Sequence, residues 1–326
     1  MFKLTLRSAL LALTVLLLNS CGGNPWGLNL SFTDSPIDTA LGVNVSISNI
    51  EFVKSNGTTL NSAAFDPPTS VDIFTYQGGL AIPVLQDLEI GIGNYTAINV
   101  TLSTDPLSAL SSVTEPDGSH ILYVPPGNAP QPGTLCSTPS PTCFTIPVNF
   151  SIASDTETNV TIDFDLRKSI IQDPNDPTKY ILIPSMRAVV NELSGSITGS
   201  VDSSLISEQA NCIQGMAVYA YVGNVTPTDV DIGSTGTQPI STALVGLNAT
   251  SGQYNFTLAF LPPGPYTLAF TCQANLDIAN QVNPVSIVPP AKLQTSNATA
   301  IQFTSVTKSP IQVTANQTTF VALTHP

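Results

Sequence analysis

Cys21 is the residue whose chemistry is easiest to infer, because of what precedes it. Lys3 and Arg7 give the chain a basic start, and residues 9–18 form a ten-residue run that is apolar with one exception. As a helix this run would rise about 15 Å, half of the roughly 30 Å hydrocarbon core of a bilayer. The run therefore indicates an export signal and not a transmembrane helix, and we expect residues 1–20 to be removed.

The residues that end this segment resemble the bacterial lipobox, in which a cysteine thiol is acylated before the signal is cleaved. Leu18-Asn19-Ser20-Cys21 places a small residue directly before the cysteine. The resemblance implies a lipid anchor on Cys21 that holds the protein to the membrane. The alternative is an ordinary cleaved signal, which would leave a reactive free thiol in an oxidising compartment.

The residue after Cys21 is Gly22 and not aspartate. By resemblance to the sorting of Gram-negative lipoproteins, this implies passage to the outer membrane, on either its periplasmic or its surface face. The short glycine-rich segment 21–27 is typical of a tether between lipid and fold.

Four further cysteines, an even number in an exported chain, predict two disulfides. Of the three connectivities that four cysteines permit, we expect Cys136–Cys143 and Cys212–Cys272. On the chain-entropy model the longer bridge would stabilise the fold by roughly 4 kcal/mol and the shorter one by about 2–3 kcal/mol. Zinc ligation would require paired cysteines with histidines nearby. The chain has only two histidines, so we predict no metal site.

No arrangement for nucleophilic catalysis or cofactor binding stands out. The chain has no Gly-x-Ser-x-Gly motif, and His120, expected in a turn, is the one histidine well inside a predicted domain. Gly91-x-Gly93 lacks the third glycine of a dinucleotide site and precedes a strand. We expect no cofactor and no enzymatic activity. Paired carboxylates that hydrolyse glycosides leave no local signature, so a glycan-acting enzyme remains the alternative.

Two further motifs have a functional and a structural interpretation. Tyr219 and Tyr221 share one face of a predicted strand, so they are a candidate platform for sugar rings, although such tyrosines commonly pack inside. Residues 173–177 (DPNDP) offer oxygen ligands to calcium but lack the spacing of a calcium loop, so we favour a proline-limited turn.

The overall charge limits the classes of partner that the protein could bind. The formal charge of −13 becomes −15 when Lys3 and Arg7 leave with the signal, and only 10% of residues are charged. An acidic surface repels phosphate backbones, so we exclude nucleic acid as a partner. A glycan or another envelope protein remains as a candidate partner beside the membrane.

The elements that must position these residues are almost all strands. Residues 42–54 alternate with period two but change parity, which predicts a bulge near Ser48 and Asn49, and Asn56-Gly57 then predicts a hairpin turn. A second alternating row runs over residues 160–166, which would direct Asp163 and Asp165 to solvent.

Later in the chain, residues 253–260 and 265–272 read as two strands joined by a tight hairpin at Pro262-Pro263-Gly264, with Cys272 facing the core. Short strands near 311–313 and 320–323 would complete this part. The proline-rich stretch 124–142 predicts a surface loop stapled by the first disulfide, since loops of this length are functional or loosely ordered.

Three motifs in the first part of the chain resemble a family of bacterial lipoprotein domains of unknown function. They are Thr33-Asp34-Ser35-Pro36, Ile50-Glu51-Phe52, and Asp163-Phe164-Asp165-Leu166-Arg167-Lys168-Ser169 followed by Ile183-Pro184 and Arg187. The resemblance extends over about residues 28–190, with the proline-rich loop as an insertion. It implies fold and location, and no activity.

The second part resembles the carboxypeptidase regulatory-like and transthyretin-like sandwich domains, through Gly252-x-Tyr254-x-Phe256 and the segment 261–267 (LPPGPYT). This resemblance implies an accessory module with a carbohydrate-binding-like fold, from which a ligand does not follow.

Together these observations predict an all-β protein of two β-sandwich domains after a cleaved lipoprotein signal peptide. The expected parts are residues 1–20 as signal peptide, 21–27 as lipidated tether, 28–192 as the sandwich of unknown function and 193–326 as the carboxypeptidase regulatory-like sandwich. We expect a lipid-anchored envelope protein that serves as a non-enzymatic binding or structural module. A glycan-binding accessory or glycan-acting enzyme is the alternative.

Overall fold

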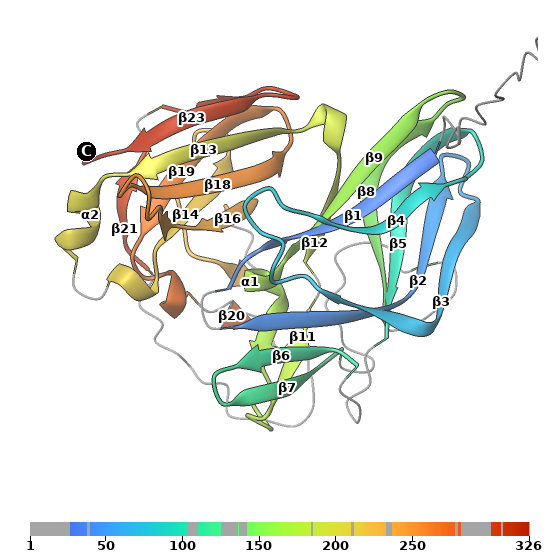
Figure 1. The fold of residues 1–326 in the computed structure, drawn as a ribbon, viewed down its shortest axis with the longest axis horizontal. Helices are drawn as coiled ribbons and strands as arrows, with labels where there is room; N and C mark the ends of the chain where they lie inside the picture. Colours follow the sequence, from blue (N-terminus) through green and yellow to red (C-terminus); the bar gives the residue numbers. More distant parts are fainter. Residues whose placement is uncertain are drawn as a thin grey trace, which may run out of the picture.

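The structure is a computed structural model that describes most of the chain beyond residue 26. The described residues are 27–37, 40–103, 110–124, 136, 142–183, 185–209, 212–232, 237–277, 280–281, 301–307 and 309–325. The expected signal, Cys21 and most of the proline-rich loop lie outside these ranges. Within them, strands far outnumber helices, and the predicted all-β sandwich class is confirmed (Figure 1).

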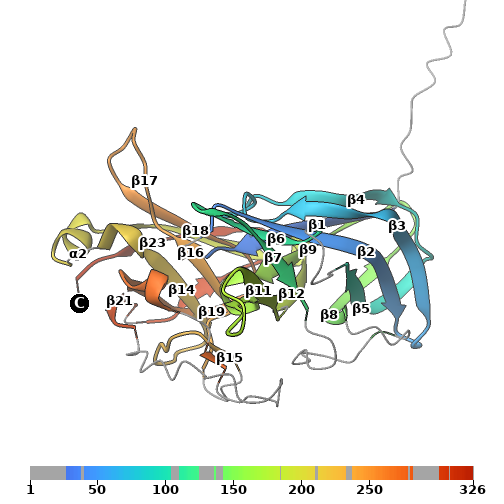
Figure 2. The same ribbon diagram turned by 90° about the horizontal axis from the view of Figure 1, so that it is seen from below.

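Strands of residues 27–190, here called the first half, form two sheets (Figures 1 and 2). One has the order β12-β9-β1-β4, from Met186–Val190, Glu157–Asp165, Gly27–Ser35 and Ile82–Leu88. The other has the order β10-β11-β7-β6-β2-β5-β8, with β3 paired to β2. Its strands are Ile170–Gln172, Lys179–Leu182, Gly118–Tyr123, Ser112–Glu115, Gly42–Lys54, Gly93–Leu102, Cys143–Ile152 and, for β3, Thr59–Asp72.

Strands of residues 195–325, the second half, form two further sheets and one short pair. The first sheet, β17-β18-β13-β23, consists of Gly246–Leu247, Tyr254–Leu261, Gly195–Val201 and Thr318–Leu323. The second, β16-β14-β19-β21 with β22 paired to β19, consists of Ser241–Leu244, Ala217–Val222, Gly264–Thr271, Phe303–Val306 and Ile311–Val313. β15 (Asp231–Ile232) pairs with β20 (Asn280–Gln281).

Short helices lie where strands end. Those of the described residues are the α-helices α1 (Leu166–Ser169) and α2 (Ser203–Ser207) and the 3-10 helices η1 (Asn191–Leu193), η2 (Cys212–Gln214) and η3 (Ala274–Leu276). η1 connects β12 to β13, at the place where we expect the domain boundary. Among the described residues, none of the helices is long and apolar enough to cross a membrane.

The apolar residues of β2 are buried in the alternating pattern that the sequence predicts. Val43, Val45 and Ile47 are buried, and so are Ile50 and Phe52 after the change of parity. The pairing of β2 with both neighbours shifts register between Ile47 and Asn49, which is the predicted bulge. The amide of Gly57 donates to the carbonyl of Lys54 at 2.8 Å, which closes the predicted turn.

The connection at Pro262-Pro263 differs from the prediction. β18 pairs with β13 and β17, whereas β19 pairs with β14, β21 and β22, so these consecutive strands lie in opposite sheets. The connection is therefore an arch between sheets and not a hairpin. Two prolines have no N–H with which to pair adjacent strands, and the Tyr266 hydroxyl instead donates to the Pro262 carbonyl at 2.7 Å.

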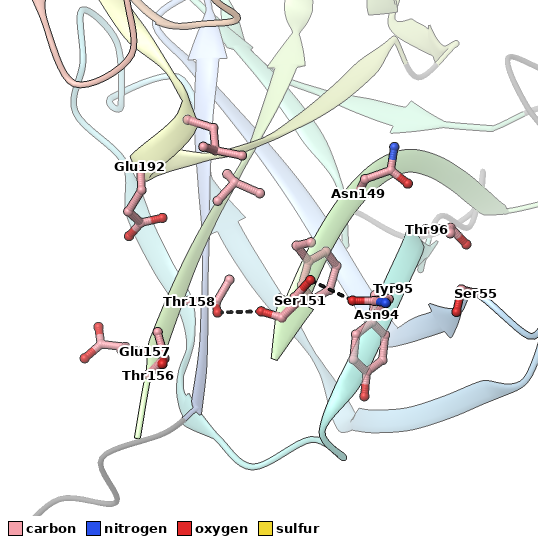
Figure 3. A pocket seen from close by; sticks show the side chains of 13 residues that line it. Ser55, Asn94, Tyr95, Thr96, Asn149, Ser151, Thr156, Glu157, Thr158 and Glu192 are labelled. Carbon is pink, nitrogen blue, oxygen red and sulfur yellow. Dashed lines mark hydrogen bonds between the residues drawn. The ribbon is translucent and has the colours of Figure 1, made fainter. Parts of the chain in front are cut away.

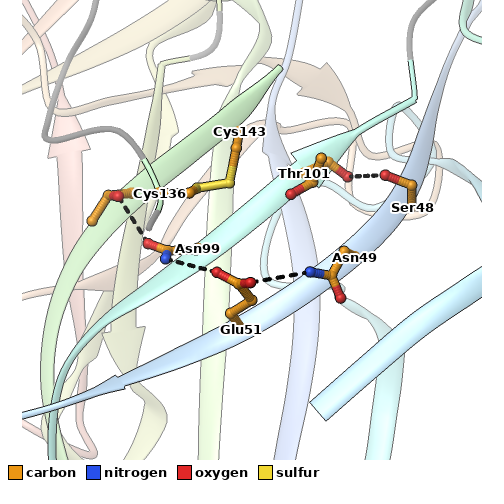
Figure 4. Close-up of a disulfide and its surroundings, with 8 residues drawn as sticks. Ser48, Asn49, Glu51, Asn99, Thr101, Cys136 and Cys143 are labelled. Atoms are coloured by element: carbon orange, nitrogen blue, oxygen red, sulfur yellow. Dashed lines mark hydrogen bonds between the residues drawn. A yellow bond between two sulfur atoms is a disulfide. The ribbon is translucent and has the colours of Figure 1, made fainter. Parts of the chain in front are cut away.

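Both expected disulfides are present, Cys136–Cys143 and Cys212–Cys272. Figure 4 shows the first of them beside a polar network on β2, β5 and β8. Glu51, 6% exposed, accepts hydrogen bonds from the amides of Asn99 at 3.1 Å and Asn49 at 3.4 Å. The Thr145 hydroxyl donates to Asn99 at 2.8 Å. These bonds tie three neighbouring strands together, so the glutamate has a structural role.

Candidate functional site

Tyr219 and Tyr221 do not form an exposed platform. Both are 0% exposed, because β21 and η3 cover the face of β14 that carries them. The Tyr219 hydroxyl donates to Asp277 Oδ2 at 2.6 Å, and the Tyr221 hydroxyl donates to the Thr228 carbonyl. Burial raises the pKa of Tyr221. The predicted alternation of β14 is correct, but a second small core occupies its other face, so a sugar ring cannot reach these tyrosines.

Two of the motifs that carry the family resemblance meet in space. β1 and β9 are parallel and pair in register along their whole length, which places Thr33 opposite Asp163 and Ser35 opposite Asp165. Asp34, Asp163 and Asp165 are 3–6% exposed. The expectation that Asp163 and Asp165 face solvent is therefore wrong. The reason is that the second half of the chain covers this end of the sheet.

Basic side chains of the first half reach into the second half at this place. Arg167, 4% exposed, donates from Nη1 to the carbonyl of Ala274 at 2.6 Å and from Nη2 to the carbonyl of Pro36 at 3.2 Å. Its guanidinium lies 5.6 Å from the centroid of the Tyr219 ring, a cation–π distance. One arginine thus contacts β14 and η3 from α1 and holds the two halves against each other.

Two more cations act in the same way. Lys168 Nζ lies 2.8 Å from Asp165 Oδ2 and donates to the carbonyl of Pro239. Arg187 pairs with Asp163 and donates to the carbonyl of Phe260 at 2.5 Å. We call Asp34, Asp163, Asp165, Arg167, Lys168 and Arg187 the interface cluster.

Hydroxyl groups complete the contact around the interface cluster. The hydroxyls of Ser35 and Ser241 lie 3.1 Å apart across the two halves. The Thr33 hydroxyl lies 2.7 Å from the carbonyl of Leu80, in the loop whose Gly79 approaches Ala259 of β18. The first motif thus places a loop of the first half on a sheet of the second.

Burial shifts the pKa values of two acids in the interface cluster. The pKa of Asp34 is raised well above its ordinary value, by desolvation first and then by repulsion from Asp163 and Asp165. Desolvation also raises the pKa of Asp163, although Arg187 opposes it. Three acids and three bases share this buried site, and their charges are used within the protein. The cluster is suited to fixing orientation and not to proton transfer to a ligand.

An open groove lies at the other end of the first half (Figure 3). Its volume is about 610 Å³. It runs between β5, β8, the start of β9 and η1. Most of its exposed wall is apolar, and hydroxyl and amide side chains are the most numerous polar groups along it. The lining residues are Ser55, Asn94, Tyr95, Thr96, Asn149, Phe150, Ser151, Thr156, Glu157, Thr158, Val190, Glu192 and Leu193.

The groove wall is preorganised by hydrogen bonds. Ser151 donates to Asn94 Oδ1 at 2.7 Å, which joins β8 to β5. The rings of Tyr95 and Phe150 stack with centroids 5.0 Å apart and an angle of 9°, but both are nearly buried and offer no face to a ligand. Binding here would depend on hydrogen bonds and not on ring stacking.

The charged groups that line the groove are both acids. Asn29 Nδ2 donates to Glu157 and to Asn159 Oδ1, and Asn159 Nδ2 donates to Glu192 at 2.7 Å. This row of amides holds the two carboxylates along one rim. With no lysine, arginine or histidine among its lining residues, the groove favours neutral or cationic polar ligands over anions.

The histidines do not support a catalytic triad. His120 lies in β7 and not in a turn as expected, and its ring nitrogens contact Asp117 and the carbonyl of Thr178. His325 pairs with Glu208. Within the described ranges neither imidazole hydrogen-bonds to a serine, threonine or cysteine side chain. The carboxylates of residues 173–177 are used internally, since Asp173 accepts from Tyr123 at 2.6 Å and Asp176 pairs with Lys179.

Neither the groove nor the grouping of Glu115 and Asp117 with His120 is among the features predicted from the sequence. The groove is lined by strands far apart in sequence, so no local motif marks it. The second grouping does have a local signal. Asp117-Gly118 is a strong hairpin turn, and β6 and β7 pair around it, with Glu115 opposite Gly118. Such a hairpin brings the side chains at its tip together.

Comparison with known proteins supports the predicted resemblance for the first half and not for the second. Residues 27–184 match the family model described as "Domain of unknown function (DUF4382)". This confirms, in that coarser form, the resemblance to a domain of unknown function. The match does not reach the second half, whose resemblance to carboxypeptidase regulatory-like domains stays a prediction. No curated protein matches the chain.

Solved structures similar to this chain are distant. One is a Bacteroides thetaiotaomicron protein of the group DUF1812, to which polysaccharide binding is ascribed, with 9% identity, a TM-score of 0.20 and coverage of 75% of this chain and 76% of the other. Another is GBS52, the minor pilin of Streptococcus agalactiae, with 11% identity, a TM-score of 0.17 and coverage of 91% and 94%. Similarity at this level does not extend to function.

Proposed function

We propose that this chain is a lipid-anchored protein of the outer membrane, which acts as a non-enzymatic binding or structural module. The observation that carries the proposal is the interface cluster, in which buried Arg167 and the partly buried Lys168 and Arg187 join the two halves. Two sandwiches fixed in this way form one elongated body, which suits a module that stands off from a membrane. The export signal, the lipobox-like cysteine and the acidic composition support the location.

The anchor is tested by metabolic labelling with a palmitate analogue. We expect label on the wild-type chain and none on Cys21→Ser, which should be recovered as an unprocessed or soluble form with an unchanged circular dichroism spectrum. Cys212→Ala with Cys272→Ala serves as a control for cysteines that should not carry lipid. Absence of label on the wild type would remove the anchor and the proposed location together.

A glycan-binding role is the second candidate, and the groove favours it. Amides, hydroxyls and two carboxylates line a groove that is open to solvent, and such groups recognise neutral sugars by hydrogen bonds. The carboxylates Glu157 and Glu192 would accept from sugar hydroxyls, while Asn149 would both donate and accept.

A glycan array with the Cys21→Ser chain tests this candidate, together with a turnover assay on each glycan that binds. We expect binding of a neutral glycan without hydrolysis, and weaker binding by Asn149→Ala and Ser151→Ala. Thr198→Ala, on β13 of the second half, is the matched control and should bind normally. Hydrolysis that is lost in Glu157→Gln would show that the chain is an enzyme and not a binding module. Absence of binding to every glycan would leave the structural role as the remaining candidate.

A further inference from the structure

The tip of the hairpin formed by β6 and β7 brings three metal-type donor groups together. Glu115 ends β6, Asp117 lies in the turn and His120 lies in β7. His120 Nε2 is 3.0 Å from Asp117 Oδ1 and 3.7 Å from Glu115 Oε2. One donor atom from each of the three residues lies within 4.8 Å of the others.

These separations fit a small divalent cation. Zinc binds imidazole nitrogen and carboxylate oxygen at about 2.0–2.2 Å, which places neighbouring donor atoms roughly 3.0–3.6 Å apart in tetrahedral or octahedral geometry. The two separations from His120 Nε2 lie close to this range. Small changes in side-chain rotamers would therefore be enough, and the backbone of the hairpin could stay where it is.

Contacts from outside the trio orient two of its members. His120 Nδ1 lies 3.3 Å from the carbonyl oxygen of Thr178. A carbonyl only accepts, so Nδ1 carries a proton in this contact. Nε2, which donates to Asp117 Oδ1 here, would face the same carboxylates as a ligand once a cation displaced its proton. Metal-binding histidines usually donate their other ring N–H to a carbonyl or carboxylate in this way.

The second contact comes from Tyr180, on β11, which pairs with β7 in parallel. Its ring meets the His120 ring edge-on at 5.9 Å, and Glu115 lies near its hydroxyl. The histidine and one carboxylate are thus held by a neighbouring strand that does not belong to the trio. Asp117 is exposed at the turn, which leaves the solvent side of the trio open.

We propose that Glu115, Asp117 and His120 bind a divalent transition-metal cation of the zinc type. One imidazole and two carboxylates supply three ligands, and water or a ligand from a partner completes the coordination. Imidazole selects zinc, nickel or cobalt over calcium and magnesium, which prefer oxygen alone. The site is independent of the groove and of the lipid anchor.

Isothermal titration of Zn²⁺ into the full chain carrying Cys21→Ser tests the site, since that substitution removes a thiol that would bind zinc. We expect one equivalent to bind. His120→Gln should weaken binding by more than about 100-fold, because changes outside the ligand shell alone cost about 10–100-fold. The matched control is His325→Gln, since His325 pairs with Glu208 outside the trio, and its affinity should not change.

Thermal unfolding gives a second readout that does not depend on heat of binding. Zn²⁺ should raise the Tm of the Cys21→Ser chain and of His325→Gln, and should leave the Tm of His120→Gln and Glu115→Gln unchanged. A protonated His120 that merely pairs with the two acids predicts no difference between these variants. In that case all variants would respond to Zn²⁺ alike or none would, and the metal site would be overturned.

Discussion

The two ends of the paired strands β1 and β9 have the same kind of sequence and opposite surroundings. At one end Asn29, Glu157 and Asn159 form a polar row along the rim of an open groove. At the other end Ser35, Asp163 and Asp165 are buried against the second half. Polar residues that alternate with apolar ones therefore mark the face that is not the sandwich core. Whether that face meets water depends on what packs on it.

The largest effect should come from removing a cation of the interface cluster. Arg187→Ala leaves Asp163 buried without its partner, and breaking a buried ion pair on one side costs about 3–5 kcal/mol. We expect a loss of this size in the free energy of unfolding, measured with urea. Lys179→Ala is the matched control, because it removes a half-exposed pair with Asp176, worth about 0–1 kcal/mol. Equal losses would mean that the interface cluster is not truly desolvated.

The next effect concerns pH. Burial and neighbouring acids raise the pKa of Asp34 above its ordinary value of 3.8, so the folded protein holds this proton more tightly than the unfolded chain. The resulting stability is complete below pH 3.8 and is lost as pH rises through the folded-state pKa. We expect Tm to fall over this range, and Asp34→Asn to reduce the fall.

At neutral pH Asp34→Asn should also stabilise the fold, because the neutral amide avoids the desolvation of a buried charge and its repulsion by Asp163 and Asp165. The exposed Asp66→Asn is the matched control and should retain the wild-type pH profile. A variant Asp34→Asn that is less stable at pH 7 would show that the charge at this position is needed.

A smaller effect is expected at the open end. Asn29→Ala removes donors to Glu157 and Asn159 and the acceptor of the Asp87 amide at 2.8 Å. Because water can replace these partners, we expect a loss of about 1 kcal/mol in urea unfolding. A loss as large as that of Arg187→Ala would remove the contrast between the two ends.

The smallest effect should be that of Glu192→Gln. The amide oxygen of glutamine can still accept from Asn159, and exposed substitutions usually change stability by no more than about 0.5 kcal/mol. We expect an unchanged Tm in differential scanning calorimetry. A shift of several degrees would show that the charge of this rim carboxylate matters to the fold.

Local patterns in the sequence predict elements well and their partners less well. The bulge after Ile47, the Asn56-Gly57 turn and both disulfides follow from rules that act within one strand, one turn or one covalent bond. Asp163 and Asp165 do not face solvent as predicted, because the second half of the chain covers them. The Pro262-Pro263 connection was mistaken for a hairpin because alternation does not tell whether consecutive strands pair or face each other.

The candidate sites also divide into one that local sequence could predict and one that it could not. The trio at the β6–β7 hairpin lies within six residues and could be inferred from the Asp117-Gly118 turn. The groove draws on β5, β8, β9 and η1, whose approach depends on how two sheets close at their edges. No motif in one strand contains that information.

Parallel pairing has a consequence for how this chain is made. Asn29 pairs with Asn159, 130 residues later, and Ser196 pairs with Thr318, 122 residues later. Contacts so distant in sequence make folding slow, and neither sheet can close while its later strand is still being synthesised. Under the proposed export, this delay keeps the polypeptide loose while it threads through a translocation pore.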